Sequence, residues 1–202
     1  KSAELSEDSG LYALPNMPPC TSASHDDALA RMRALGHGAS GLTIADHGFL
    51  LLLTYKNGWD QRGNDDCGCS AFVAQRWSLG MDYEVGDVCS RNGWLYECLI
   101  AHEADEALEP GFSPMHWKRL SHAGGVPISH GDMRTLNGTG PMDWYLGGDV
   151  GSLCDVIGNC YEAVYGVRLV GCEIQILADN NAADADADLT VNGAWRAILP
   201  SG

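Results

Sequence analysis

Eight cysteines and seven histidines are the residues of this 202-residue chain whose types could support catalysis or bind a metal, and their spacing decides between these roles. Cys67 and Cys69 are separated by one residue, whereas paired zinc ligands are usually separated by two or more, and no C-x-x-C motif accompanies them. The histidines form no H-E-x-x-H pattern, and no G-x-S-x-G motif is present. The sequence therefore predicts no catalytic residues and favours free, partly buried thiols.

An acidic segment at residues 179–188 is the other candidate for a metal site, because Asp184, Asp186 and Asp188 alternate like the start of a calcium loop. Such a loop needs glycine at its sixth position and glutamate at its twelfth. Here the glycine is missing, and Trp195 occupies the twelfth position. We interpret the segment as a solvated loop and expect no metal and no other cofactor.

Aromatic residues between positions 74 and 121 suggest non-covalent recognition instead. Short alternating strands around Asn92-Gly93 predict a compact β unit. The segment resembles the small chitinase-type carbohydrate-binding modules in its sequence pattern: a tryptophan, then a tyrosine followed by Gly86-Asp87, the Asn-Gly turn and a final tryptophan. That resemblance implies sugar binding on surface aromatic rings, since sugars bury their C–H faces against flat side chains. The candidates are Trp77, Tyr83, Trp94, Tyr96 and Trp117.

A β unit of this size needs some of these rings for its own core. Alternation along the predicted strands places Tyr83, Tyr96 and Trp117 in the core. Trp94 at the turn and Trp77 are then the exposed pair. Both roles, core residue and ligand platform, stay open for each ring.

The composition limits the fold and the partners. With 25 glycines, the chain favours turns and short strands over a helical bundle. A net charge of -15, with only 12 scattered lysines and arginines, argues against binding nucleic acid and fits neutral or cationic partners better. The longest apolar run, residues 49–53, is far shorter than the roughly 20 residues of a membrane helix, so we expect no membrane insertion.

Two helices are predicted before the β unit. Residues 26–35 carry leucine and methionine at helical spacing. A second helix begins at Thr43, whose hydroxyl forms a capping box with Asp46, and it ends at Gly58. This helix is expected to turn residues 50–53 inward.

Strands are predicted in the β unit and near the end of the chain. In the first hairpin Cys89 faces Tyr96, and Cys98 lies diagonally at about 7–8 Å, too far for an easy disulfide. Residues 167–177 predict a second tight hairpin, and residues 195–199 one last strand.

Residues 43–64 and 155–162 form two blocks that occur in the same order as two blocks of a known protein family. The second block resembles a motif that the family often carries, D-L-x-G-N-V-W-E-W, and together the blocks resemble the sulfatase-modifying, formylglycine-generating-enzyme branch of the C-type lectin fold. The resemblance implies an α+β, C-type-lectin-like domain with two helices and short twisted antiparallel strands. This domain would comprise residues 11–73 and 122–202, with residues 74–121 as the inserted β unit.

By the same resemblance, Gly158, Asn159 and Glu162 have structural roles, in which the two polar side chains tie loops together by hydrogen bonds. The chain departs from the family at Tyr161 and Ala163, where two tryptophans are usual. It also lacks the cysteine pair and the R-G-G-S-W block on which the family's oxidases depend. An oxidase is therefore poorly supported.

With this lectin core and no catalytic cysteines, the chain resembles phage and prophage tail proteins. That resemblance implies a non-enzymatic receptor-binding protein, or adhesin, at the tail tip or fibre of a virion, acting outside the cell. Its partners would be a host cell-surface glycan or protein, other tail subunits and further copies of itself. The alternatives are an oxidase or another enzyme of the same fold, and a purely structural virion subunit. The chain is also expected to lack the family's closing strands.

Overall fold

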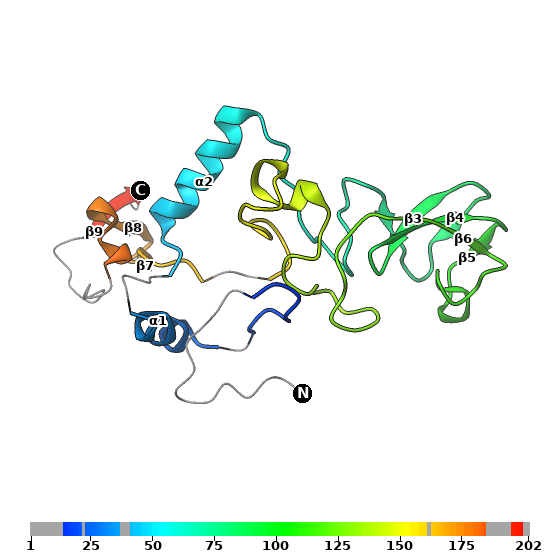
Figure 1. Ribbon diagram of the computed structural model, residues 1–202, viewed down its shortest axis with the longest axis horizontal. Helices are drawn as coiled ribbons and strands as arrows, with labels where there is room; N and C mark the ends of the chain where they lie inside the picture. The colour runs from blue at the N-terminus through cyan, green and yellow to red at the C-terminus, as the bar shows by residue number, and fades with distance from the viewer. Residues whose placement is uncertain (1–13, 22, 37–40, 161–162, 185–194, 200–202) are drawn as a thin grey trace. The chain divides into compact units, whose positions relative to one another are not determined.

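The computed structural model describes residues 14–21, 23–36, 41–160, 163–184 and 195–199. The chain divides into two compact units, one of residues 1–13, 21–57 and 162–202 and the other of residues 14–20 and 58–161. Helices and short, mostly antiparallel strands in small sheets make up the fold (Figure 1), which confirms the predicted α+β class. The predicted insertion falls within the second unit, and its boundaries stay a prediction.

Both helices of the first unit begin at side-chain caps. Helix α1 (His25–Ala34) follows Ser24, whose hydroxyl accepts a backbone hydrogen bond of 3.1 Å from the first turn. Helix α2 (Ile44–Asn57) follows Thr43. The backbone N–H of Asp46 donates to Thr43 Oγ1 at 3.0 Å, and the Thr43 N–H donates to the Asp46 carboxylate at 3.3 Å. This reciprocal pair is the predicted capping box.

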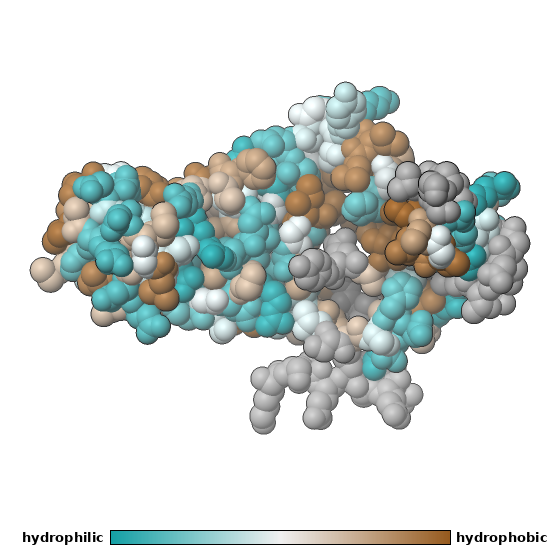
Figure 2. Space-filling model, turned by 180° about the vertical axis from the view of Figure 1, so that it is seen from behind, coloured by the Kyte–Doolittle hydropathy of each residue, from teal (hydrophilic) through white to brown (hydrophobic). Residues whose placement is uncertain are grey.

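Helix α2 does not turn its leucines inward, so that prediction was wrong. None of its residues is buried, and Leu51 and Leu52 are 48% and 69% exposed. Successive residues of a helix are about 100° apart, so four consecutive leucines cannot share one face. Figure 2 shows the resulting hydrophobic surface along the helix, to which Phe49 and Tyr55 also contribute.

The core of the first unit is small. Tyr165, Leu177 and Ala182 are buried together, and Leu29 and Met32 of α1 pack against them. The Tyr165 hydroxyl donates to a backbone carbonyl at the start of α1 at 3.1 Å, which fastens the helix to this core.

Three strands form an antiparallel sheet in the first unit, in the order β7-β8-β9. They are β7 (Val167–Val170), β8 (Glu173–Leu177) and β9 (Trp195–Leu199). Gly171 and Cys172 both have positive φ, at 56° and 64°, the backbone that a tight two-residue hairpin requires. The predicted second hairpin and last strand are thereby confirmed. The short helix η4 (Ala178–Ala183) follows β8.

The second unit contains a four-stranded sheet in the order β1-β3-β4-β6 (Figure 1). Its strands are β1 (Gln75–Arg76), β3 (Val88–Arg91), β4 (Trp94–Cys98) and β6 (Trp117–His122). Strands β3 and β4 pair around Asn92-Gly93, whose φ angles of 50° and 80° fit the predicted tight turn. The register places Cys89 opposite Tyr96, as predicted.

Beside this sheet, β2 (Asp82–Tyr83) and β5 (His102–Glu103) form a two-stranded antiparallel pair, and η1 (Glu106–Leu108) leads from β5 toward β6. The rest of the second unit consists of loops and the short helices η2 (Met142–Trp144) and η3 (Leu146–Gly148). These loops pack around a buried tryptophan in η2, the side chain of Trp144.

Candidate functional site

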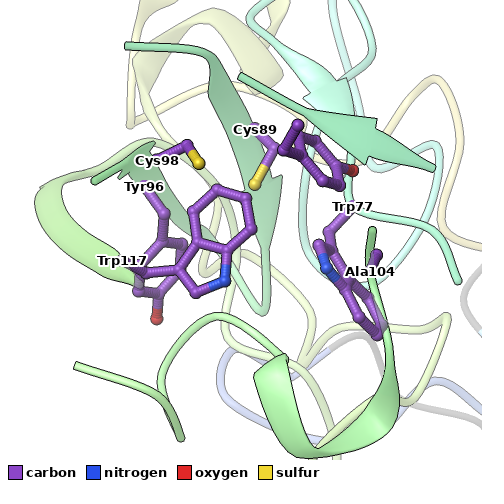
Figure 3. Packing of buried hydrophobic residues seen from close by; sticks show 7 residues of the cluster. Trp77, Cys89, Tyr96, Cys98, Ala104 and Trp117 are labelled. Atoms are coloured by element: carbon purple, nitrogen blue, oxygen red, sulfur yellow. The ribbon is translucent and has the colours of Figure 1, made fainter. Parts of the chain in front are cut away.

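Four of the five predicted sugar-binding rings lie in one buried cluster of the second unit. Tyr83, Tyr96 and Trp117 are buried there, as strand alternation predicted, together with Trp77. The sulfur atoms of two cysteines point into the same cluster beside the Trp117 indole (Figure 3). The remaining ring, Trp94, is half-buried and packs against the cluster.

The prediction that Trp77 is exposed was wrong, because its side chain is only 4% exposed. Its backbone N–H donates to Ser90 O at 3.0 Å and continues the parallel pairing of β1 with β3. The guanidinium of Arg91 then covers the indole at 5.1 Å from the ring centroid. Parallel pairing between segments so far apart in sequence cannot be inferred from the alternation of one hairpin.

Trp94 is the predicted platform residue that the structure leaves nearest to the surface. The guanidinium of Arg119 lies over its ring at 4.4 Å from the centroid, and His122 meets it edge to face at 5.0 Å. A shift of register between β4 and β6 occurs between Trp94 and Tyr96. Such an irregularity redirects side chains, and here Arg119 of β6 reaches the tryptophan ring.

The thiols of the cluster are unsuited to nucleophilic chemistry. Burial raises the pKa of the Cys89 thiol to about 12, and it also raises the pKa of the Cys98 thiol. His102 Nδ1 lies 3.8 Å from Cys98 Sγ, but it also lies 2.7 Å from the carbonyl oxygen of Ile100, to which it donates. A protonated, buried thiol beside an imidazole engaged elsewhere is not an activated nucleophile.

Sequence reasoning missed two exposed aromatic residues, Phe112 and His130. Phe112 is 63% exposed, and the His130 side chain is 49% exposed. Their ring centroids are 4.6 Å apart. Phe112 directly follows Pro110-Gly111, a turn signal that removes it from strand alternation and that could have marked it as a surface residue. His130 lies outside the predicted β unit, and its sequence context carries no comparable signal.

Asn159 ties together loops of the second unit. Its Oδ1 accepts from the Thr135 backbone N–H at 2.7 Å and from Asn64 Nδ2 at 3.2 Å. Gly158 has φ +80°, and a Cβ there would approach Asn64 O to 2.3 Å, so only glycine fits. Glu162, the third residue of the predicted structural motif, lies outside the described residues.

The structure describes one of the two candidate metal segments, Cys67–Cys69, but only part of the other, the acidic loop at residues 179–188. Among the described residues, no group of three His, Cys, Asp or Glu side chains is arranged to hold a metal ion. Cys67 and Cys69 are buried in a loop where Cys67 Sγ accepts from Arg91 and Cys69 Sγ accepts from the Gly93 N–H, both at 3.3 Å. Asp186 and Asp188 of the acidic loop lie outside the described residues.

Comparison with known proteins bears on the β unit alone. No curated protein matches the chain. Within the described part of the chain, no helix has the length and apolar character needed to span a bilayer. Residues 76–118 match the model of carbohydrate-binding module family 5/12, and this match supports glycan binding by the segment that holds the aromatic cluster.

Proposed function

We propose that the chain is a non-enzymatic adhesin that binds a host cell-surface glycan through the β unit of residues 74–121. The observation that carries this proposal is the match of residues 76–118 to a carbohydrate-binding module. The segment has its own aromatic core and a sheet in which β1 pairs in parallel with β3 while β3-β4 and β4-β6 pair antiparallel, so it presents side chains from a fixed backbone. A rigid scaffold of this kind lowers the entropic cost of binding.

Trp94 is the ring on which we place the sugar. Its side chain packs against the core cluster, and the Arg119 guanidinium lies over the indole. A pyranose that stacks on the indole displaces this guanidinium, which can then donate hydrogen bonds to the sugar hydroxyls. An aromatic face with one polar donor beside it is the usual composition of a small-ligand site.

The absence of catalysis is also part of the proposal. The family's oxidases depend on a reactive cysteine pair, whereas burial raises the pKa of the Cys67, Cys69, Cys89 and Cys98 thiols and keeps them protonated near neutral pH. If the chain were an oxidase instead, it would convert a cysteine-containing peptide, and its thiols would titrate as a reactive pair.

We place this adhesin at the tail tip or fibre of a phage or prophage particle, as a homo-oligomer among other tail subunits. The resemblance of residues 43–64 and 155–162 to lectin-fold proteins of such tails supports this setting. The net charge of -15 disfavours anionic ligands, which fits recognition of a neutral surface glycan.

A glycan array followed by calorimetric titration tests the binding function. We expect the wild-type chain to bind at least one neutral oligosaccharide and Trp94→Ala to weaken binding at least about tenfold, since the stacking surface is lost. Arg119→Ala leaves the ring in place and should change affinity without changing the fold. Val85→Ala, at an exposed apolar residue of the same unit, is the matched control and should bind like the wild type.

Two results would contradict the proposal. Absence of wild-type binding to any glycan leaves the purely structural subunit as the better interpretation. Conversion of a cysteine-containing peptide by the wild-type chain favours the oxidase. The setting on a phage tail is tested separately, by binding of labelled protein to bacterial cells and competition by the soluble glycan.

A further inference from the structure

The exposed ring pair Phe112 and His130 is held unusually firmly for a surface feature. Single exposed apolar residues are common and need no explanation. Here, however, the two rings come from separate segments and lie 4.6 Å apart between centroids, at an interplanar angle of 45°. Each of the two rings is also held in place by contacts with buried groups of the protein.

Phe112 is presented by a rigid turn. Its backbone N–H donates to Glu109 O at 3.1 Å, which closes a four-residue turn with Pro110 and Gly111 at the central positions. Gly111 has φ +95°, so this is the residue pair that a type II turn requires. Pro110 is fully buried, and a Cβ on Gly111 would lie 3.2 Å from the Tyr96 hydroxyl. The turn is therefore anchored to the aromatic core.

His130 is fixed by hydrogen bonds at both ring nitrogens. Asn92 Oδ1 accepts from the Gly131 N–H at 2.9 Å, which orients the amide so that Asn92 Nδ2 faces His130 Nδ1 at 3.1 Å. An amide nitrogen only donates, so His130 Nδ1 accepts and Nε2 carries the proton. That proton is donated to Glu109 Oε1 at 3.0 Å. The ring thus offers its carbon atoms, and no free nitrogen, to a ligand.

A buried ion pair completes the support. Glu109 Oε1 accepts from Arg91 Nε at 2.6 Å, with side chains only 11% and 16% exposed. Arg91 is held in turn by Cys67 Sγ at 3.3 Å and by the Trp77 ring. The charge beneath the two rings is therefore compensated, and the surface above it is neutral.

We propose that Phe112 and His130 form a second sugar-contact surface, which takes the C–H face of a neutral pyranose. This inference rests on the proposed glycan-binding function. It extends the recognition surface beyond residues 76–118, because His130 comes from a loop outside the matched segment. Rings fixed before the ligand arrives lose little freedom on binding, which favours affinity.

The neutral class of the ligand follows from the charges. Both His130 nitrogens are engaged by protein groups, and Arg91 compensates Glu109, so none of these groups offers an uncompensated charge to an anionic sugar. The chain's net charge of -15 repels such a sugar in addition.

The test compares variants of the full chain by calorimetric titration with chitohexaose, cellohexaose and a sialylated oligosaccharide. Phe112→Ala should weaken binding of a neutral hexasaccharide about tenfold, and His130→Ala about fivefold. Phe112→Trp should remain within about twofold of the wild type, because it keeps an aromatic face. The matched control is Met115→Ala, an apolar residue 73% exposed on the same loop, which should bind like the wild type.

The outcomes separate this inference from the function on which it rests. If the wild type binds a neutral hexasaccharide and Phe112→Ala binds equally well, the second surface is refuted while glycan binding stands. Equal binding by His130→Ala refutes the contribution from outside the matched segment. If the sialylated sugar binds best, the neutral ligand class is wrong. If the wild type binds none of the three probes, the inference falls together with glycan binding by this unit.

Discussion

Replacing Glu109 by glutamine isolates the charge that lies beneath the exposed ring pair. The substitution keeps the size of the side chain and one oxygen acceptor, but it removes the negative charge that compensates Arg91. The largely buried Arg91 guanidinium would then lack its counter-charge, and the cost should appear as a loss of folding stability.

The magnitude follows from the burial of the pair. The Arg91 Nε to Glu109 Oε1 distance is 2.6 Å, and the two side chains are 16% and 11% exposed. Removing one partner of a buried ion pair costs about 3–5 kcal/mol, and the retained acceptor places Glu109→Gln near the lower end, at about 3 kcal/mol. The exposed pair Lys118–Glu97 is the matched comparison, with side chains 60% and 34% exposed. Glu97→Gln should cost less than about 1 kcal/mol.

Urea unfolding followed by tryptophan fluorescence measures both variants. Trp195 is the one tryptophan of the first unit, and the other five of the chain's six lie at positions 58–161, so the signal mainly reports the second unit. If Glu109→Gln costs no more than Glu97→Gln, the ion pair does not anchor the turn, and the argument that His130 and Phe112 are held from below is refuted.

Alkaline pH should destabilise the second unit, because burial raises the pKa of the Cys89 thiol from 9.0 to about 12. As the pH rises from 9 to 12, the Cys89 thiol loses its proton in the unfolded chain but not in the folded protein. The free energy of unfolding therefore falls by about 1.4 kcal/mol per pH unit over this range. Cys89→Ala should reduce this loss when urea unfolding is compared at pH 8 and pH 11. In the native protein a thiol reagent should modify the exposed Cys20 and Cys172 quickly, and fast reaction of the four buried thiols would contradict their burial. Asn159→Ala should lower the free energy of unfolding by about 2–4 kcal/mol, because the buried Thr135 N–H loses its acceptor; a loss below about 1 kcal/mol would show that the loops do not depend on this amide.

Local signals in the sequence predict much of this fold. The capping box at Thr43, the positive-φ turn at Asn92-Gly93 and the hairpin at Gly171-Cys172 each depend on a few adjacent residues, and the structure contains all three. Alternation within one hairpin was likewise enough to place Tyr96 in the core. These features follow from backbone geometry that neighbouring residues impose on each other.

The failures have a common cause in contacts between distant segments. Trp77 is buried because β1 pairs in parallel with β3, and α2 leaves Leu52 exposed because the first unit's small core does not reach it. His130 reaches Phe112 only through the fold of the second unit. The Pro110-Gly111 dipeptide indicates a turn, but alternation of strand residues does not apply at a turn and so does not predict the exposure of the next residue, Phe112.

The size of the β unit explains why its core aromatic residues and its binding residues must differ. A segment of about forty residues has too little apolar side-chain volume for a core unless large rings supply it. Trp77, Tyr83, Tyr96 and Trp117 all lie in that core, so they cannot also face a sugar without unfolding the unit. Recognition is therefore left to residues at strand ends and turns. Trp94 begins a strand and Phe112 ends a turn, which makes these two positions the ones where substitutions can alter ligand choice at the least cost to stability.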